Sequence, residues 1–215
     1  MNGEMIQAPG WGYLLPEEAI STGMITPEEF QTVTAGKYAG DADRLPAIIE
    51  SASMAVRNYC GWHLYPSCEC EFTDRMLYGN GRIKAVGPDL LILLPAAHVE
   101  KIESIEVDGR ECTDYSADQG GLLHIFNARL HVSDRRTQVT VKYVAGLRES
   151  MMANIRELIA NKAIRGITGT AGVTSETAGG VSISYANSWA NGGGAGALSS
   201  LEADVLQPYK LGGVF

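Results

Sequence analysis

The chain has few aromatic residues, little positive charge and no long apolar run, and each shortage argues against a class of protein. Aromatic residues make up 7% of the sequence and do not cluster, which argues against a carbohydrate-binding module built on exposed rings. The longest apolar run, residues 90–94, is far too short to span a bilayer. Lysine and arginine number 17 against 25 acidic residues, a formal net charge of −8, so the chain as a whole does not attract nucleic acid.

The four cysteines stand at spacings that match no zinc or redox motif. Cys68 and Cys70 are separated by one residue, which is the spacing of two neighbours on one face of a strand. Cys60 lies close to His63, but no second cysteine–histidine pair follows. We therefore interpret these three cysteines and Cys112 as reduced, half-buried thiols, and we expect neither a metal nor a cofactor.

Catalytic and phosphate-binding motifs are also missing. The sequence contains no G-x-S-x-G, no H-E-x-x-H and no paired histidines at metal-binding spacing. Glycine-rich residues 191–196 follow no buried strand and lack the lysine of a P-loop, so they predict a flexible hinge. Asp41 and Asp43 precede a helix, where N-capping explains them better than acid–base chemistry. We therefore expect no catalytic residues and a protein that is not an enzyme.

The N-terminal residues carry no recognisable targeting signal. Residues 1–5 have neither a basic region nor an apolar one, as a secretory signal would require. Residues 1–15 are polar and contain proline and glycine, which predicts an N-terminal arm. We therefore expect a protein made in a reducing cytosol, without membrane contact.

Two long amphipathic helices are predicted, one over residues 42–60 with Gly61 as its C-cap and one over residues 150–165. On the first, Ser53 and Arg57 fall largely opposite the apolar stripe, with Arg44 and Glu50, and are expected to face solvent. The two apolar stripes match, so we expect the helices to pack on each other. Their predicted core residues are Leu45, Ile48, Ile49, Ala52, Val56, Tyr59, Ile155, Leu158 and Ile159.

Between these helices the hydrophobic period changes from 3.6 residues to two. Residues 72–143 predict about six short strands, arranged as a small antiparallel sandwich or barrel. Residues 79–81 and 108–109 are tight-turn signals between the strands. The continuous apolar run at residues 90–94 predicts a strand that is covered on both faces.

The ends of helices and the C-terminal region carry further local signals. Thr26-Pro-Glu-Glu29 and Ser199-Ser-Leu-Glu202 are capping boxes, each predicting the start of a short helix. Val181, Ile183 and Tyr185 alternate with polar residues, which predicts an exposed arm strand. The chain then ends in an apolar tail that is too small to bury itself. We expect another chain to receive this tail, and its removal to leave the fold intact; it comprises Tyr209, Lys210, Leu211, Val214 and Phe215.

The predicted fold class is therefore α+β: a helical body, with two long packed helices and short ones, carrying an inserted small antiparallel β-domain and an extended C-terminal arm. Four regions are expected along the chain. They are an N-terminal arm (1–15), a helical body (16–66 and 147–167), the inserted β-domain (67–146), and the C-terminal arm with its short helix and docking tail (168–215).

The order of several segments resembles the head–tail connector, or adaptor, proteins of tailed bacteriophages. Residues 43–62 (DRLPAIIESASMAVRNYCGW) resemble the first helix of that family, which ends in a Tyr-Cys-Gly-like turn. Residues 91–95 (LILLP) and 102–109 (IESIEVDG) look like the β-domain inserted in longer members. Residues 173–185 (VTSETAGGVSISY) and 206–211 (LQPYKL) are similar to the C-terminal arm of the same group.

This resemblance, which extends with gaps over residues 43–211, implies a structural virion protein. The family forms a ring, typically a dodecamer, in the phage neck between the portal and the stopper or tail, with functions in virion assembly and genome ejection. In that family the helices form the ring body, so the helical body expected here would be the ring-body domain. The C-terminal arm and tail reach the portal protein. DNA passes through the lumen without specific binding, and an acidic chain suits a channel that must not hold its cargo.

Three alternatives stay open at this point. Within the phage neck, the chain could be a stopper or tail-completion protein one ring further from the head. It could instead be a cytosolic enzyme with an unrecognised site in the β-domain, for example around Cys68, Cys70 and His98. A carbohydrate- or peptide-binding β-module is the third, and the scarcity of aromatic residues ranks it lower.

Overall fold

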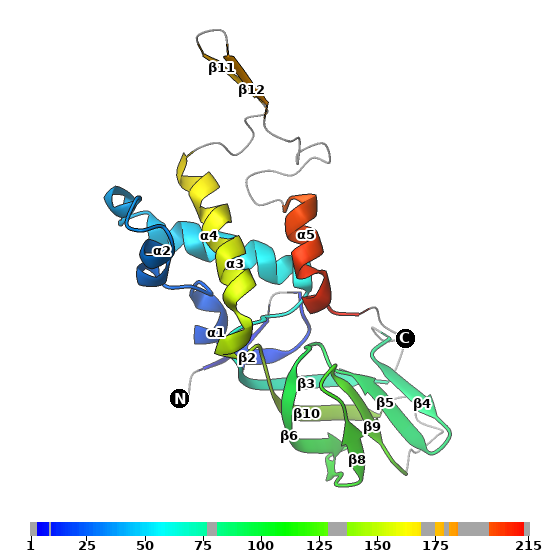
Figure 1. The fold of residues 1–215 in the computed structure, drawn as a ribbon. Coiled ribbons are helices and arrows are strands. Elements are labelled where there is room, and N and C mark those ends of the chain that lie inside the picture. The colour runs from blue at the N-terminus through cyan, green and yellow to red at the C-terminus, as the bar shows by residue number, and fades with distance from the viewer. Residues whose placement is uncertain are drawn as a thin grey trace. The chain divides into compact units, whose positions relative to one another are not determined.

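A computed structural model gives the fold of the protein (Figure 1). It describes residues 4–8, 10–76, 81–128, 137–168, 175–178, 181–184 and 198–212. The fold is mixed α+β, and the chain divides into two compact units. The β unit consists of residues 1–20, 61–149 and 209–215, and the helical unit consists of residues 21–60 and 150–208.

The β unit contains a six-stranded sheet in which every neighbouring pair is antiparallel. Its central pairs join the long strand β10 to β3 on one side and to β6 on the other. A two-residue turn joins β6 to β7, as predicted. Its residues, Asp108 and Gly109, both have positive φ. In sheet order the strands are β1 (Met5–Gln7), β2 (Leu14–Pro16), β3 (Cys68–Arg75), β10 (Gln138–Ala145), β6 (Val99–Val107) and β7 (Arg110–Glu111).

A second, four-stranded antiparallel sheet completes the β unit (Figure 1). Its strand β5 alternates: Leu90 and Ile92 are fully buried, whereas Leu91 and Leu93 are only half-buried. The prediction of a strand covered on both faces was therefore wrong, because only one face of β5 is completely covered. In sheet order the strands are β4 (Ile83–Val86), β5 (Asp89–Leu93), β9 (Leu122–Ile125) and β8 (Tyr115–Ala117).

The N-terminal segment is part of this unit rather than an arm. Strands β1 and β2 pair with each other, and Leu14 of β2 pairs with Glu71 of β3. Trp11, Tyr13 and Leu15 alternate along the segment and are all buried. The prediction of an arm over residues 1–15 was therefore wrong for the described part, residues 4–8 and 10–15. The polar and glycine-rich composition suggested an arm, but the segment forms a hairpin with three large side chains in the core.

The helical unit is organised around α3 (Leu45–Cys60) and α4 (Ala153–Thr168), which pack against each other as predicted (Figure 1). Both shorter helices predicted from capping boxes are present, and both boxes form. Gly61, at a φ of +81°, ends α3. The remaining elements are α1 (Glu18–Ser21), α2 (Pro27–Val33), α5 (Ser200–Leu206), and the 3-10 turns η1 (Ala39–Asp41), η2 (Glu149–Met151) and η3 (Gln207–Tyr209).

The predicted helical core residues lie mainly in the interior. Seven are buried, while Ile48 and Tyr59 are half-buried. The Tyr59 hydroxyl donates a hydrogen bond to the carbonyl oxygen of Ala203, 3.3 Å away on α5. The seven buried residues are Leu45, Ile49, Ala52, Val56, Ile155, Leu158 and Ile159.

Two polar residues of α3 were placed on the wrong face. Ser53 and Arg57 were expected to face solvent, but both are 0% exposed. The Ser53 hydroxyl accepts a hydrogen bond from the main-chain N–H of Met24 at 2.9 Å. The Arg57 guanidinium donates one to the main-chain carbonyl of Thr22 at 3.1 Å. The segment before α2 therefore covers this side of α3, and the buried main-chain N–H of Met24 has a buried partner.

Candidate functional site

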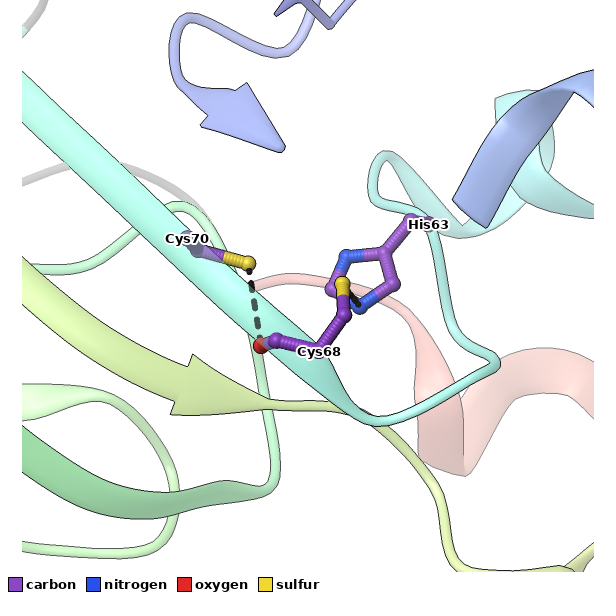
Figure 2. A group of neighbouring side chains, drawn as sticks. All are labelled: His63, Cys68 and Cys70. Carbon is purple, nitrogen blue, oxygen red and sulfur yellow. Dashed lines mark hydrogen bonds between the residues drawn. The ribbon is translucent and has the colours of Figure 1, made fainter. Parts of the chain in front are cut away.

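One group of buried side chains in the β unit combines imidazole and thiol chemistry. His63 follows α3 by way of Gly61 and Trp62, and Cys68 and Cys70 lie at the start of β3. Because side chains two apart point to the same face of a strand, β3 presents both thiols on one side. Figure 2 shows the imidazole beside the Cys68 thiol, with the Cys70 thiol near the Cys68 carbonyl.

The three side chains are close enough to share a ligand. One potential metal-binding atom from each lies within 4.8 Å of the other two. The Cys68 Sγ is 3.6 Å from the His63 Nε2, and the Cys70 thiol donates to the Cys68 carbonyl oxygen at 3.6 Å. His63 is 0% exposed and Cys70 is 2% exposed, whereas Cys68 is half-buried. This is the only such group of three among the residues that the structure describes.

Hydrogen bonds to both ring nitrogens hold the His63 imidazole in one orientation. Its Nε2 lies 3.0 Å from the Ala145 carbonyl oxygen, which can only accept, so Nε2 carries the proton. Its Nδ1 lies 2.8 Å from the Tyr13 hydroxyl, which then donates to it. The Tyr13 oxygen also accepts the main-chain N–H of His63 at 3.1 Å. The buried N-terminal hairpin thus positions the histidine.

Tyr143 adds a second buried phenol beside this group. It lies directly opposite Cys70 in the register of β3 and β10, so the two side chains are on the same face of the sheet. Its hydroxyl is buried and has no hydrogen-bond partner among the described residues. Burial raises the pKa of Tyr143 well above its ordinary value, and the nearby Cys70, Tyr13 and Cys68 raise it further, against the opposing charge of Arg82.

The electrostatics of Cys70 are those of a protonated thiol. Its hydrogen bond with Cys68 raises its pKa most, and burial and the Cys68 charge raise it further. The thiolate is the nucleophilic form of cysteine, so a raised pKa argues against Cys70 as an activated nucleophile. The enzyme alternative placed a site around Cys68, Cys70 and His98, but the histidine in the described group is His63. The signal available in the sequence was the compact H-x4-C-x-C spacing.

The predicted docking tail begins on the chain's own β unit. The buried Trp62 indole N–H donates to the Tyr209 carbonyl oxygen at 2.8 Å. Leu211 is half-buried beside Gly61: a Cβ added to that glycine would lie 3.8 Å from the Leu211 Cδ1. Lys210 is exposed. Val214 and Phe215 lie outside the described residues, so the tail's docking on another chain stays a prediction.

The predicted arm strand belongs to an antiparallel pair. Strand β11 (Ser175–Ala178) pairs with β12 (Val181–Ser184), and the register places Ala178 opposite Val181. Val181 and Ile183 lie in β12, and Tyr185 lies outside the described residues. Figure 1 draws the pair as a separate two-stranded ribbon, and within the described residues these strands pair only with each other.

The surface of α5 carries the most exposed large apolar side chain of the described chain, Leu201, at 76% exposure. Val205, one turn later, is 42% exposed. Both line a surface hollow between α5 and α4, whose floor includes Leu158. An ion pair between Arg165 of α4 and Glu202 of α5 joins the two helices beside this hollow.

Comparison with known proteins adds no assignment. The sequence matches no family model, and it matches no curated protein. Among the described helices, none is both long enough and apolar enough to cross a membrane. The features available for a functional proposal are therefore the histidine–thiol group, the β11–β12 pair, the apolar surface of α5 and the resemblance in segment order.

Proposed function

We propose that the protein is a structural component of the neck of a tailed bacteriophage: a head–tail adaptor that forms a ring between the portal and the stopper or tail. The observation that carries the proposal is the β11–β12 pair, which stands between α4 and α5 in the chain and belongs to neither large sheet. Its position in the sequence is that of the C-terminal arm in the family that the chain resembles.

Physical reasoning supports a binding role for this pair. An isolated two-stranded hairpin is marginally stable in water, so it gains most from a partner. Each strand uses one edge for the other, which leaves an outer edge with main-chain groups that can pair with a strand of another chain. Strand addition of this kind would anchor the arm on the portal protein, while the helical unit forms the ring body.

Contacts between neighbouring copies would come from the helical unit. Leu201 and Val205 expose apolar surface next to the hollow between α4 and α5. Such exposed apolar surface is typical of protein–protein contacts when it is contiguous. If this surface on each copy binds a different surface on the next copy, the copies form a closed ring, provided that the rotation between neighbours returns to its starting point. With a formal charge of −8, the ring would surround DNA without holding it.

The proposal is tested with the full-length chain and the portal protein of the same phage. Light scattering should give a monomer, or a weak association, for the chain alone and a ring-sized mass increase on the portal. Replacing residues 175–184 by a glycine–serine linker of equal length should leave the melting temperature unchanged and abolish portal binding. The matched control replaces residues 191–196 by the same kind of linker and should still bind.

Two outcomes would contradict the proposal. One is an unchanged monomer mass with and without portal at micromolar concentration. The other is normal portal binding by the variant that lacks β11 and β12. Binding to the assembled adaptor ring of the phage instead of to its portal would place the chain one ring further down, as a stopper or tail-completion protein.

A further inference from the structure

We propose that His63, Cys68 and Cys70 form a binding site for a thiophilic divalent cation of the Zn²⁺ class. Two cysteine sulfurs and one imidazole nitrogen form a ligand set that suits such ions, and the three sit on a turn and an adjacent strand start that fix their spacing. This inference is independent of the proposed role in the phage neck.

The ligand distances are close to those that one ion requires. With Zn–S bonds of about 2.3 Å and a Zn–N bond of about 2.0 Å, a tetrahedral site separates its ligand atoms by about 3.5–3.8 Å. The Cys68 Sγ already lies 3.6 Å from the His63 Nε2. All three ligand atoms lie within 4.8 Å of one another, so the longest separation must shorten by at most about 1 Å, which a change of χ1 at one cysteine can supply. Figure 2 shows the Cys68 thiol beside the imidazole, joined by a dashed line to Nε2, and the Cys70 thiol nearby.

The surroundings supply an orienting partner and access for solvent. Tyr13 already contacts Nδ1, the nitrogen that must carry the proton when Nε2 binds a metal. Cys68 is half-buried, so solvent reaches this side of the cluster. Among the described residues, Tyr143 and Arg82 also interact electrostatically next to this cluster. The Tyr143 hydroxyl, buried and without a hydrogen-bond partner among the described residues, is a polar atom on the same sheet face as Cys70.

Binding has a defined proton balance. The two thiols each release one proton to solvent as their sulfurs bind the cation. The imidazole stays neutral: its proton leaves Nε2 and one is taken up at Nδ1, which then donates to the Tyr13 oxygen. The Ala145 carbonyl loses its N–H donor in this exchange and must turn aside, because its oxygen lies 3.0 Å from Nε2, where the cation would bind. The Cys68 carbonyl likewise loses the Cys70 thiol as its donor. The loss of these two hydrogen bonds is small compared with the formation of two metal–thiolate bonds.

Cobalt(II) is the probe, because it takes the place of Zn²⁺ and its bonds to thiolates produce charge-transfer absorption. The reduced, chelator-treated, full-length chain should bind one Co²⁺ with thiolate charge-transfer bands, and added Zn²⁺ should remove them. Cys68→Ser should lose the bands. Cys112→Ser is the matched control, since Cys112 is also a half-buried free cysteine but lies outside the cluster, and it should keep them.

A second readout separates coordination from a general effect on folding. Zn²⁺ should raise the melting temperature of the parent and of Cys112→Ser, but not that of Cys68→Ser. Tyr13→Phe should keep the bands while weakening Zn²⁺ affinity about 10- to 100-fold, measured by competition with a chromogenic chelator. Because Cys68 is half-buried, its serine variant should fold even if Cys70→Ser does not. Absence of charge-transfer bands in the folded parent, or their retention in Cys68→Ser, would overturn the proposal and leave three satisfied core side chains.

Discussion

The two compact units bury polar side chains in different ways. In the helical unit, Ser53 and Arg57 of α3 bond to main-chain groups of residues 22–24, and both side chains are enclosed. In the β unit, His63 bonds to the Tyr13 side chain, and two thiols lie next to it. The first arrangement closes a loop over a helix. The second brings together groups that can exchange protons or bind a cation.

This difference shows that buried polarity alone does not identify a functional site. Ser53 accepts the N–H of the buried Met24, and Arg57 donates to the Thr22 carbonyl, so both tie residues 22–24 to α3, which is a structural task. The His63 cluster contains metal-binding atom types and a neighbouring hydroxyl, that of Tyr143, with no partner in the described structure. The kind of group and its remaining bonding capacity, rather than the depth of burial, distinguish the two places.

The largest expected effect tests the structural task assigned to Arg57. Arg57→Ala should lower the free energy of unfolding by about 2–4 kcal/mol, because it leaves the Thr22 carbonyl without this donor and opens a cavity. That loss would be comparable to the roughly 2–5 kcal/mol expected for Ile49→Ala in the apolar core of the same helix. Urea denaturation of both variants measures the losses.

Arg44→Ala is the control for this prediction. Arg44 is exposed and pairs only loosely with Asp41, at 3.9 Å, so its removal should change stability by no more than about 0.5 kcal/mol. Equal and small losses for Arg44→Ala and Arg57→Ala would show that Arg57 is not part of the core. The helical unit would then no longer provide an example of a buried charged side chain with a structural role.

An intermediate effect is expected at the end of the chain. Deleting residues 209–215 removes the carbonyl that accepts the buried Trp62 N–H and the side chain of Leu211 beside Gly61. The loss should be about 1–3 kcal/mol, the usual cost of a buried donor without a partner. This replaces the sequence-based expectation that removal of the tail leaves the fold and its melting temperature nearly unchanged. Deleting only residues 213–215 is the control and should leave the melting temperature within error; equal melting temperatures for both deletions would contradict the role of Tyr209.

Local signals made much of the helical unit predictable. The capping boxes at Thr26 and Ser199 need only residues three apart, and the apolar stripe of α3 needs only its own period. The C-cap glycine of α3 is likewise a local requirement, since Gly61 has positive φ. The sequence could therefore place these elements without knowledge of any distant contact.

The errors occurred where distant segments meet. The burial of Ser53 and Arg57 depends on residues 22–24, about 30 positions earlier, which no periodicity within α3 reports. Tyr13 meets His63 across 50 positions, so the N-terminal hairpin and the histidine–thiol cluster were both missed. The spacing of Cys68 and Cys70 correctly indicated one strand face, but nothing local indicated that the turn after α3 would bring His63 to it.

The smallest effect concerns a polar contact at the surface of the β unit, which contrasts with the buried cluster. Asp89 accepts the Asn127 main-chain N–H at 2.9 Å and the His124 Nε2 at 3.0 Å, and these bonds, the first above all, lower the pKa of its carboxyl group. A lowered pKa in the folded state means that the contribution to stability is present above the pKa of the unfolded chain and is lost as the pH falls through the folded value. Asp89→Asn should therefore be slightly less stable than the parent at neutral pH, and the two should converge in acid. Urea denaturation across this pH range measures the difference, with Asp204→Asn, an exposed substitution on α5, as the control. A difference between Asp89→Asn and the parent that persists unchanged into acid would show that the charge of Asp89 does not stabilise the fold.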